Sequence, residues 1–145
     1  IGEDITPIEA DFDAMFLIAK PAEGVSTPAA YRYFDEHPDT EHGDISGVIE
    51  GIKNNDIFLI SENIHNDLEN AAKHFCPSIE EIEELMLTDG ALLSKVTGSG
   101  PTVFGIFEND TDRKKAAADL RSAGLAADII YAGCIKPDYD KGERI

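Results

Sequence analysis

A short turn made of Gly98, Ser99 and Gly100 separates two segments whose composition favours β-strands. Residues 92–96 lead into the turn, and residues 102–107, rich in β-branched and aromatic side chains, lead out of it. This pattern predicts an antiparallel strand pair. Glycine adopts positive φ and lacks a Cβ, so such a turn can approach a ligand and present consecutive amides to an anion. An ordinary hairpin turn uses the same residues, and this alternative stays open.

Two common glycine-rich nucleotide loops do not match this turn. A dinucleotide-binding loop leads into a helix whose N-terminus faces the phosphates, whereas Pro101 and a β-type segment follow Gly100. A P-loop needs a Gly-Lys-Ser/Thr ending, and no such tripeptide occurs in the sequence. If this turn contacts phosphate, it does so as neither a dinucleotide-binding loop nor a P-loop.

The remaining pattern predicts helices around an antiparallel sheet of about four strands. Apolar runs at residues 14–19 and 127–135 predict a first and a last strand. Helices are expected at residues 29–36, 45–54, 58–65, 66–75, 79–88 and 111–123. A capping box beginning at Ser78 is expected to open the fifth helix, with Glu83 and its neighbouring glutamates on a solvated face. The predicted fold class is α+β, with the helices on one face of the sheet.

Charge limits the partners of this chain. It carries 29 acidic and 12 basic residues, a formal net charge of −17. Nucleic-acid binding needs a basic footprint, so nucleic acid is not expected as a partner. No apolar run reaches membrane-spanning length and no charged-then-apolar leader opens the chain, so no membrane partner and a cytoplasmic location are expected. The two cysteines and four histidines lack metal-ligand spacing, so no metal site is expected.

Length and composition suit one domain. The chain has 145 residues, of which 42% are hydrophobic, enough for a single core. It begins at Ile1 rather than at a methionine, which favours a piece of a longer protein. No interior linker interrupts residues 1–145, and residues 1–11 and 137–145 are expected to be loosely held ends.

Three motifs in this order resemble the GHMP kinases, a superfamily of small-molecule kinases. The run at residues 96–107 resembles their third, glycine-rich motif. Lys20-Pro21, residues 24–27 and Tyr31 resemble one branch, and so does the Asn-Asp-Leu-Glu sequence at residues 66–69. That branch phosphorylates 4-diphosphocytidyl-2-C-methyl-D-erythritol. The resemblance spans residues 12–136 and implies a ferredoxin-like split β-α-β fold with inserted helices.

The resemblance also implies a reaction and partners. The implied reaction transfers the γ-phosphate of ATP, with Mg²⁺, to the 2-hydroxyl of the diphosphocytidyl substrate, in non-mevalonate isoprenoid synthesis. The ATP loop and the catalytic residues are implied to lie in an N-terminal kinase domain that is missing from this sequence. No catalytic residue is therefore expected here, and the fragment alone is expected to be inactive.

Six residues are implied to contact ligands: Gly98, Ser99, Gly100, Thr102, Thr27 and Tyr31. The glycine turn is implied to lie beside the substrate and the transferred phosphate, with Thr102 as a nearby hydroxyl donor. Tyr31 is implied to stack on the cytosine ring, and Thr27 to bond the substrate. The residues alone equally allow a core position for Tyr31 and helix capping by Thr27. Asn66 and Asp67 are expected to be scaffold residues, and Lys95 to point outward from its strand.

Two alternatives remain at this stage. The first is another GHMP kinase, acting on homoserine, mevalonate or a sugar. The second is a non-catalytic α+β ligand-binding domain in which the glycine turn is only a hairpin. A contact to a cytidine ring separates the first alternative from the expected kinase.

Overall fold

The computed structural model describes residues 6–38 and 41–135. In this part of the chain, four antiparallel strands form one sheet in the order β2-β3-β1-β4. The strands are β1 (Met15–Lys20), β2 (Ala91–Val96), β3 (Val103–Phe107) and β4 (Asp128–Gly133). Leu17 of β1 pairs with Gly105 on one side and Tyr131 on the other. The predicted α+β class, the four-stranded antiparallel sheet and the hairpin around the glycine turn are confirmed.

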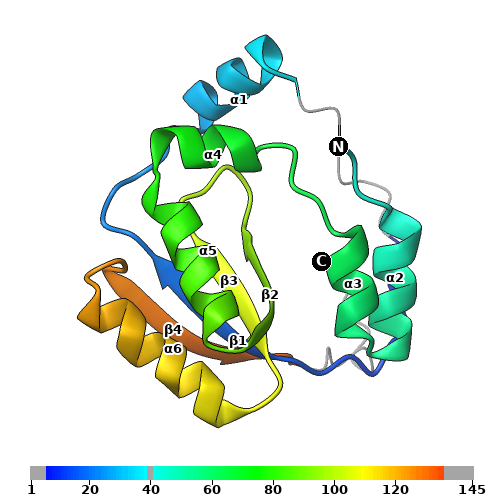
Figure 1. Ribbon diagram of the computed structural model, residues 1–145. Helices are drawn as coiled ribbons and strands as arrows, with labels where there is room; N and C mark the ends of the chain where they lie inside the picture. Colours follow the sequence, from blue (N-terminus) through cyan, green and yellow to red (C-terminus); the bar gives the residue numbers. More distant parts are fainter. Residues whose placement is uncertain (1–5, 39–40, 136–145) are drawn as a thin grey trace, which may run out of the picture.

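Six helices occur in the described residues and lie close to the predicted ranges. They are α1 (Thr27–Glu36), α2 (Ile45–Asn54), α3 (Ile57–Asn63), α4 (Glu69–Phe75), α5 (Ser78–Thr88) and α6 (Asp110–Ser122). Figure 1 shows α5 and α6 against the sheet, α4 and α1 stacked beyond the β2–β3 turn, and α2 and α3 as a pair at the side. In the described residues, no helix is long and apolar enough to cross a bilayer.

The helices do not all cover one face of the sheet, so that expectation is wrong. Leu17, Val103 and Phe107 pack with α5 and α6 in the main core. The alternate residues Phe16 and Ile106 point to the opposite face, where they form a second cluster with residues of α2 and α3. The α2–α3 pair is amphipathic and needs an apolar surface, which this second sheet face provides.

The start of α5 also differs from the expectation. Ser78 is the first residue of the helix rather than its cap, and no side chain caps the N-terminus. The Ser78 hydroxyl instead donates to Glu23 Oε2 at 2.9 Å. Glu83 is buried, not solvated. Local spacing predicted the helix correctly but did not reveal which of its faces meets β2.

The chain ends carry no regular structure where they are described. Residues 6–11 are exposed and belong to no helix or strand. Residues 1–5 and 137–145, which make up the rest of the two expected end segments, lie outside the described residues.

Candidate functional site

The glycine turn is a hydrogen-bonded loop at the end of the β2–β3 hairpin. The Thr97 N–H donates to the Thr102 carbonyl at 2.8 Å, and the Gly100 N–H donates to the Thr97 carbonyl at 3.1 Å. Gly98 and Gly100 both have positive φ, +59° and +80°, and the Gly100–Pro101 bond is cis. These conformations explain the glycines, because residues with a Cβ rarely adopt them.

The two glycines differ in their surroundings. A Cβ on Gly100 would meet Ala72 Cβ at 3.0 Å and Ile79 Cδ1 at 3.3 Å, whereas nothing lies within 4 Å of a Cβ on Gly98. Gly100 is therefore pressed against α4 and α5, and Gly98 faces open space. Within the described part of the chain, no group accepts a hydrogen bond from the Gly98 or Ser99 N–H. The open side of the loop thus carries backbone N–H groups that can donate hydrogen bonds to an anion.

Helix α1 brings Thr27 to this loop from a distant part of the sequence. The hydroxyls of Thr27 and Ser99 lie 2.8 Å apart and share a hydrogen bond. Ser26, not Thr27, caps α1, because its Oγ accepts from the Ala29 N–H at 3.4 Å. The alternative role of Thr27 as a helix cap is therefore excluded, and its hydroxyl faces the glycine loop.

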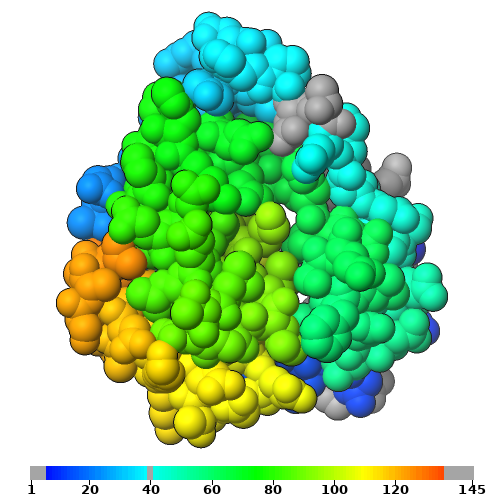
Figure 2. Space-filling model, in the orientation of Figure 1, coloured from blue at the N-terminus to red at the C-terminus, as the bar shows by residue number. Residues whose placement is uncertain are grey.

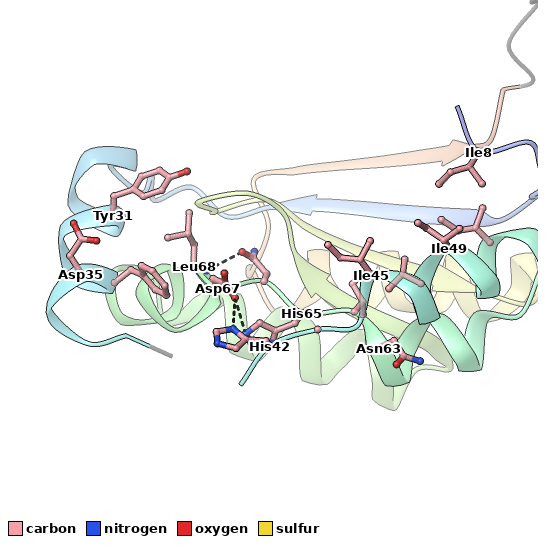
Figure 3. A pocket seen from close by; sticks show the side chains of 16 residues that line it. Ile8, Tyr31, Asp35, His42, Ile45, Ile49, Asn63, His65, Asp67 and Leu68 are labelled. Carbon is pink, nitrogen blue, oxygen red and sulfur yellow. Dashed lines mark hydrogen bonds and ion pairs between the residues drawn. The ribbon is translucent and has the colours of Figure 1, made fainter. Parts of the chain in front are cut away.

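Tyr31 lies one helical turn further along α1, at the end of a groove of about 1000 Å³. The Tyr31 groove, as we call it, is lined by residues of α1, α2 and the segment before α4, among them Tyr31, Asp35, His42, Ile45, Asn66 and Asp67. Figure 3 shows Tyr31 at one end and Ile45 and Ile49 of α2 at the other. Tyr31 is 54% exposed, so the alternative of a core position is wrong.

Charged and polar side chains form part of the groove wall. Asp67 Oδ1 lies 3.5 Å from His65 Nε2 and 3.8 Å from His42 Nδ1 (Figure 3). Asp67 does not cap α4, whose N-cap is Leu68 and has no side-chain cap bond. The groove therefore combines one exposed aromatic ring, an apolar end and a carboxylate flanked by imidazoles. This mixture suits a ligand with a flat ring and polar substituents.

Thr102 is separate from this group. Thr102 lines a smaller hollow with Lys20, Asp128 and Ile130, beside β1 and β4. The structure therefore brings together Thr27, Ser99 and the two glycines, places Tyr31 on the same helix as Thr27, and places Thr102 beside a different hollow.

An aromatic stack sets the position of α1. The Tyr33 ring lies between His37, at 4.3 Å, and His74 of α4, at 4.4 Å, with Phe75 edge-on at 5.9 Å. Because Thr27 and Tyr31 share α1 with Tyr33, this stack also determines where they lie.

A cluster of alternating charges that the sequence did not predict lies behind the loop. Lys95 Nζ lies 2.9 Å from Glu69, and Lys73 Nζ lies 2.7 Å from Glu69 and 2.8 Å from Glu83. These side chains line a hollow between α4, α5 and β2, on the face shown in Figure 2. Lys95 therefore does not simply point into solvent. The signal in the sequence was an isolated lysine in an apolar strand, which needs a nearby carboxylate if it is half-buried.

Burial and pairing shift the titration of this cluster. Burial raises the pKa of Glu69, but hydrogen bonds from Lys73 and Lys95 outweigh it and leave that pKa below its ordinary value. Burial raises the pKa of Glu83 by more than the hydrogen bond from Lys73 lowers it. Burial lowers the pKa of Lys73, yet the bonds to Glu69 and Glu83 raise it above the ordinary lysine value.

These directions predict a pH-dependent effect of Glu69→Gln. Because the folded-state pKa of Glu69 is lowered, its ionised form stabilises the protein above about pH 4.3, and this contribution is lost as the pH falls through the lowered pKa. The melting temperature of the variant should therefore lie below that of the unchanged protein at pH 7, with the gap narrowing toward pH 3. Glu84→Gln, at an exposed position of α5, is the control and should show no such trend. A gap that stays constant with pH would contradict the pairing.

In the described residues, no group of three or more His, Cys, Asp or Glu side chains is arranged to hold a metal ion.

Comparison with known proteins identifies relatives over most of the chain. A family model described as GHMP kinases C terminal matches residues 48–126. The 4-diphosphocytidyl-2-C-methyl-D-erythritol kinase of Lachnospira eligens is 36% identical over 137 residues, 94% of this chain and 48% of the relative. The kinase of the same name from Clostridium novyi is 38% identical over 109 residues, 75% of this chain and 39% of the relative. The chain thus spans less than half the length of these relatives.

Solved structures share the fold. A crystal structure of 4-(cytidine 5'-diphospho)-2C-methyl-D-erythritol kinase superposes with a TM-score of 0.70 at 22% identity, covering 91% of this chain and 46% of that one. The L. major mevalonate kinase in complex with R-mevalonate gives a TM-score of 0.67 at 16% identity, covering 92% of this chain and 45% of that one. At these identities, the superpositions show a common architecture.

Proposed function

This chain belongs to the GHMP kinases, as their C-terminal part, and from that membership we propose that it is the substrate-side half of a 4-diphosphocytidyl-2-C-methyl-D-erythritol kinase. The complete protein would transfer the γ-phosphate of ATP to the 2-hydroxyl of the cytidyl substrate, in the cytoplasm. The ATP-binding and catalytic groups would come from an N-terminal domain, consistent with relatives about twice as long as this chain.

The observation that carries the proposal is the contact between Thr27 and Ser99. This 2.8 Å hydrogen bond joins the helix that bears Tyr31 to the loop that bears the unpaired amides. A base-stacking ring and an anion-binding loop are thereby held in one rigid arrangement, as a substrate with a cytosine at one end and phosphates beyond it requires.

Each residue would have a simple role. The N–H groups of Gly98 and Ser99 would donate to phosphate oxygens, and Tyr31 would stack on the cytosine ring. Thr27 and Ser99 would supply hydroxyl contacts, Gly100 would keep the loop against α4 and α5, and Thr102 would contact ligand from the neighbouring hollow. Phosphoryl transfer depends on positioning and charge stabilisation, which such groups provide. Mg²⁺ would enter with the ATP phosphates, held by groups outside this chain.

The direct test is ADP release by the complete protein with Mg-ATP and each of four substrates: the cytidyl substrate, homoserine, mevalonate and galactose. Selective turnover of the cytidyl substrate supports the proposal. Turnover of mevalonate, homoserine or galactose instead would assign the chain to another GHMP kinase. Turnover of none would favour a non-catalytic domain.

Tyr31→Ala tests the proposed base contact. Stacking of a base on an aromatic ring contributes about 1–3 kcal/mol, so the variant should raise the KM for the cytidyl substrate about fivefold or more and leave the KM for ATP unchanged. Phe58→Ala is the matched control, because Phe58 is also an exposed ring, 67% accessible, but lies on α3 away from the Tyr31 groove. An unchanged KM for the cytidyl substrate in Tyr31→Ala would remove the base contact from the proposal.

A further inference from the structure

Strand β2 lies at the edge of the sheet, so half of its backbone groups have no neighbouring strand. The Thr97 N–H points inward and donates to Thr102 of the returning chain. Successive residues of a strand point their backbone groups to opposite sides, so the N–H and C=O of Val96 point away from the sheet. Both are nevertheless bonded, and the partners are side chains.

Glu83 and Asn66 occupy this outer edge. Glu83 Oε1 accepts from the Val96 N–H at 2.7 Å, and Asn66 Nδ2 donates to the Val96 carbonyl at 3.0 Å. Asn66 Nδ2 also donates to the Gly98 carbonyl at 2.9 Å. The same amide group thus spans the entry to the glycine loop and holds the two carbonyls on either side of Thr97.

The side-chain amide of Asn66 uses most of its hydrogen-bonding capacity. Its two N–H donors go to the Val96 and Gly98 carbonyls, and its oxygen accepts from the Leu68 N–H at 3.1 Å. An aspartate has the same shape but no donor, and it would place a carboxylate oxygen against both carbonyls. The position therefore requires a side-chain amide of this length.

The bond from Asn66 to the Gly98 carbonyl also fixes the direction of the Ser99 N–H. The carbonyl of Gly98 and the N–H of Ser99 belong to one planar trans peptide unit, so they point in opposite directions. Because the carbonyl is drawn to Asn66, the Ser99 N–H is turned to the side away from Asn66. In the described residues, no group accepts a hydrogen bond from this N–H or from that of Gly98.

The rest of the cluster keeps Asn66 in place. Glu69, the first residue of α4, binds Lys95 of β2 at 2.9 Å, so α4 and the segment before it are each attached to β2. Lys73 forms ion pairs with both Glu69 and Glu83. Glu83 in turn accepts the hydrogen bond from the Val96 N–H. The loop is thereby fixed by side chains of α4, α5 and the segment between α3 and α4.

We infer that Asn66 is a positioning residue of the kinase, which aims the Ser99 N–H at phosphate by holding the Gly98 carbonyl. The inference rests on the proposed function, and it assigns to Asn66 a role distinct from helix capping. Thr27 and Ser99 touch the ligand in this arrangement. Asn66 also lines the Tyr31 groove, but its side-chain amide donates to the Val96 and Gly98 carbonyls, so its effect on the Ser99 N–H passes through the backbone of the loop.

The test compares Asn66→Asp and Asn66→Ala in the complete protein, with Asn54→Asp at an exposed position of α2 as the control. Loss of one preorganised donor costs about 100-fold or more in kcat, so Asn66→Asp should lower kcat to that extent while the KM for the cytidyl substrate stays largely unchanged. Asn66→Ala, which lacks the repulsion, should fall between Asn66→Asp and the unchanged protein. A melting curve for each variant separates lost positioning from lost folding, and if Asn66→Asp does not fold, Asn66→Ala carries the same comparison.

A second readout does not depend on turnover. In the complete protein labelled with [15N]serine and [15N]glycine, the Ser99 amide resonance should shift on addition of inorganic phosphate, and this response should be lost in Asn66→Asp and kept in Asn54→Asp. An unchanged response in Asn66→Asp, or an unchanged kcat, overturns the inference. If the unchanged protein turns over none of the four substrates, the proposed function fails, and the resonance response alone decides the role of Asn66.

Discussion

Gly100→Ala is expected to destabilise the β2–β3 hairpin by about 2–4 kcal/mol, since backbone strain and overpacking act together. The φ of +80° is unfavourable for a residue with a Cβ. The new methyl group would also lie 3.0 Å from Ala72 Cβ, on a helix that cannot shift without disturbing Asn66 and Glu69. Native-state hydrogen exchange of the β2 and β3 amides in the complete protein measures this loss.

Gly98→Ala is the matched control for this prediction. Gly98 also has a positive φ, +59°, but nothing lies within 4 Å of the added Cβ. Only the backbone strain remains, so we expect a loss of about 1 kcal/mol. Equal losses at the two glycines would show that Gly100 is not pressed against α4 and α5 as described.

Lys73→Met is expected to destabilise the protein by about 3 kcal/mol, because removing one partner of a buried ion pair leaves a charge uncompensated. The Glu83 side chain is only 8% exposed and has Lys73 as its cation at 2.8 Å. Without Lys73, the Glu83 carboxylate keeps the Val96 N–H at 2.7 Å but lies without a counter-charge. The loss should diminish as the pH falls, since Glu83 can then take up a proton. Chemical denaturation of the complete protein at pH 7 and pH 4 measures both effects.

Two further variants complete this test. The double variant Lys73→Met, Glu83→Gln should recover part of the stability, because neither position then carries a buried unpaired charge. Lys114→Met removes a lysine that pairs with Asp110 at 2.6 Å but is 68% exposed, and it should change stability little. If Lys73→Met is as mild as Lys114→Met, the cluster contributes no more than an ordinary surface pair.

Local patterns in the sequence were sufficient to predict the helices, the strands and the family of this protein. Apolar runs, β-branched and aromatic residues, and the glycines between residues 96 and 102 predicted the strands and their hairpin, because such signals act between near neighbours in the chain. Helical spacing located the six helices of the described residues to within a few residues. The three motifs indicated the GHMP kinases, which the family model and the relatives confirm.

Other features depended on contacts between distant residues. Spacing did not show that α2 and α3 cover the second face of the sheet, since an amphipathic helix does not indicate which apolar surface it meets. Glu83 looked like part of a solvated acidic face, yet it holds the Val96 N–H across α5 and β2. Asn66 was expected to be a scaffold residue, but the sequence did not show that its side chain bonds two carbonyls about thirty residues away.

The amino-acid sequence by itself therefore determined the elements, the glycine loop and the family. Only the tertiary structure decided how the loop is held, which hydroxyl meets Ser99, and that Tyr31 lies exposed beside a groove. The physical reason is that turns and helices follow from interactions within a few residues, whereas a buried charge or a bridging amide acquires its partner only when the elements pack together.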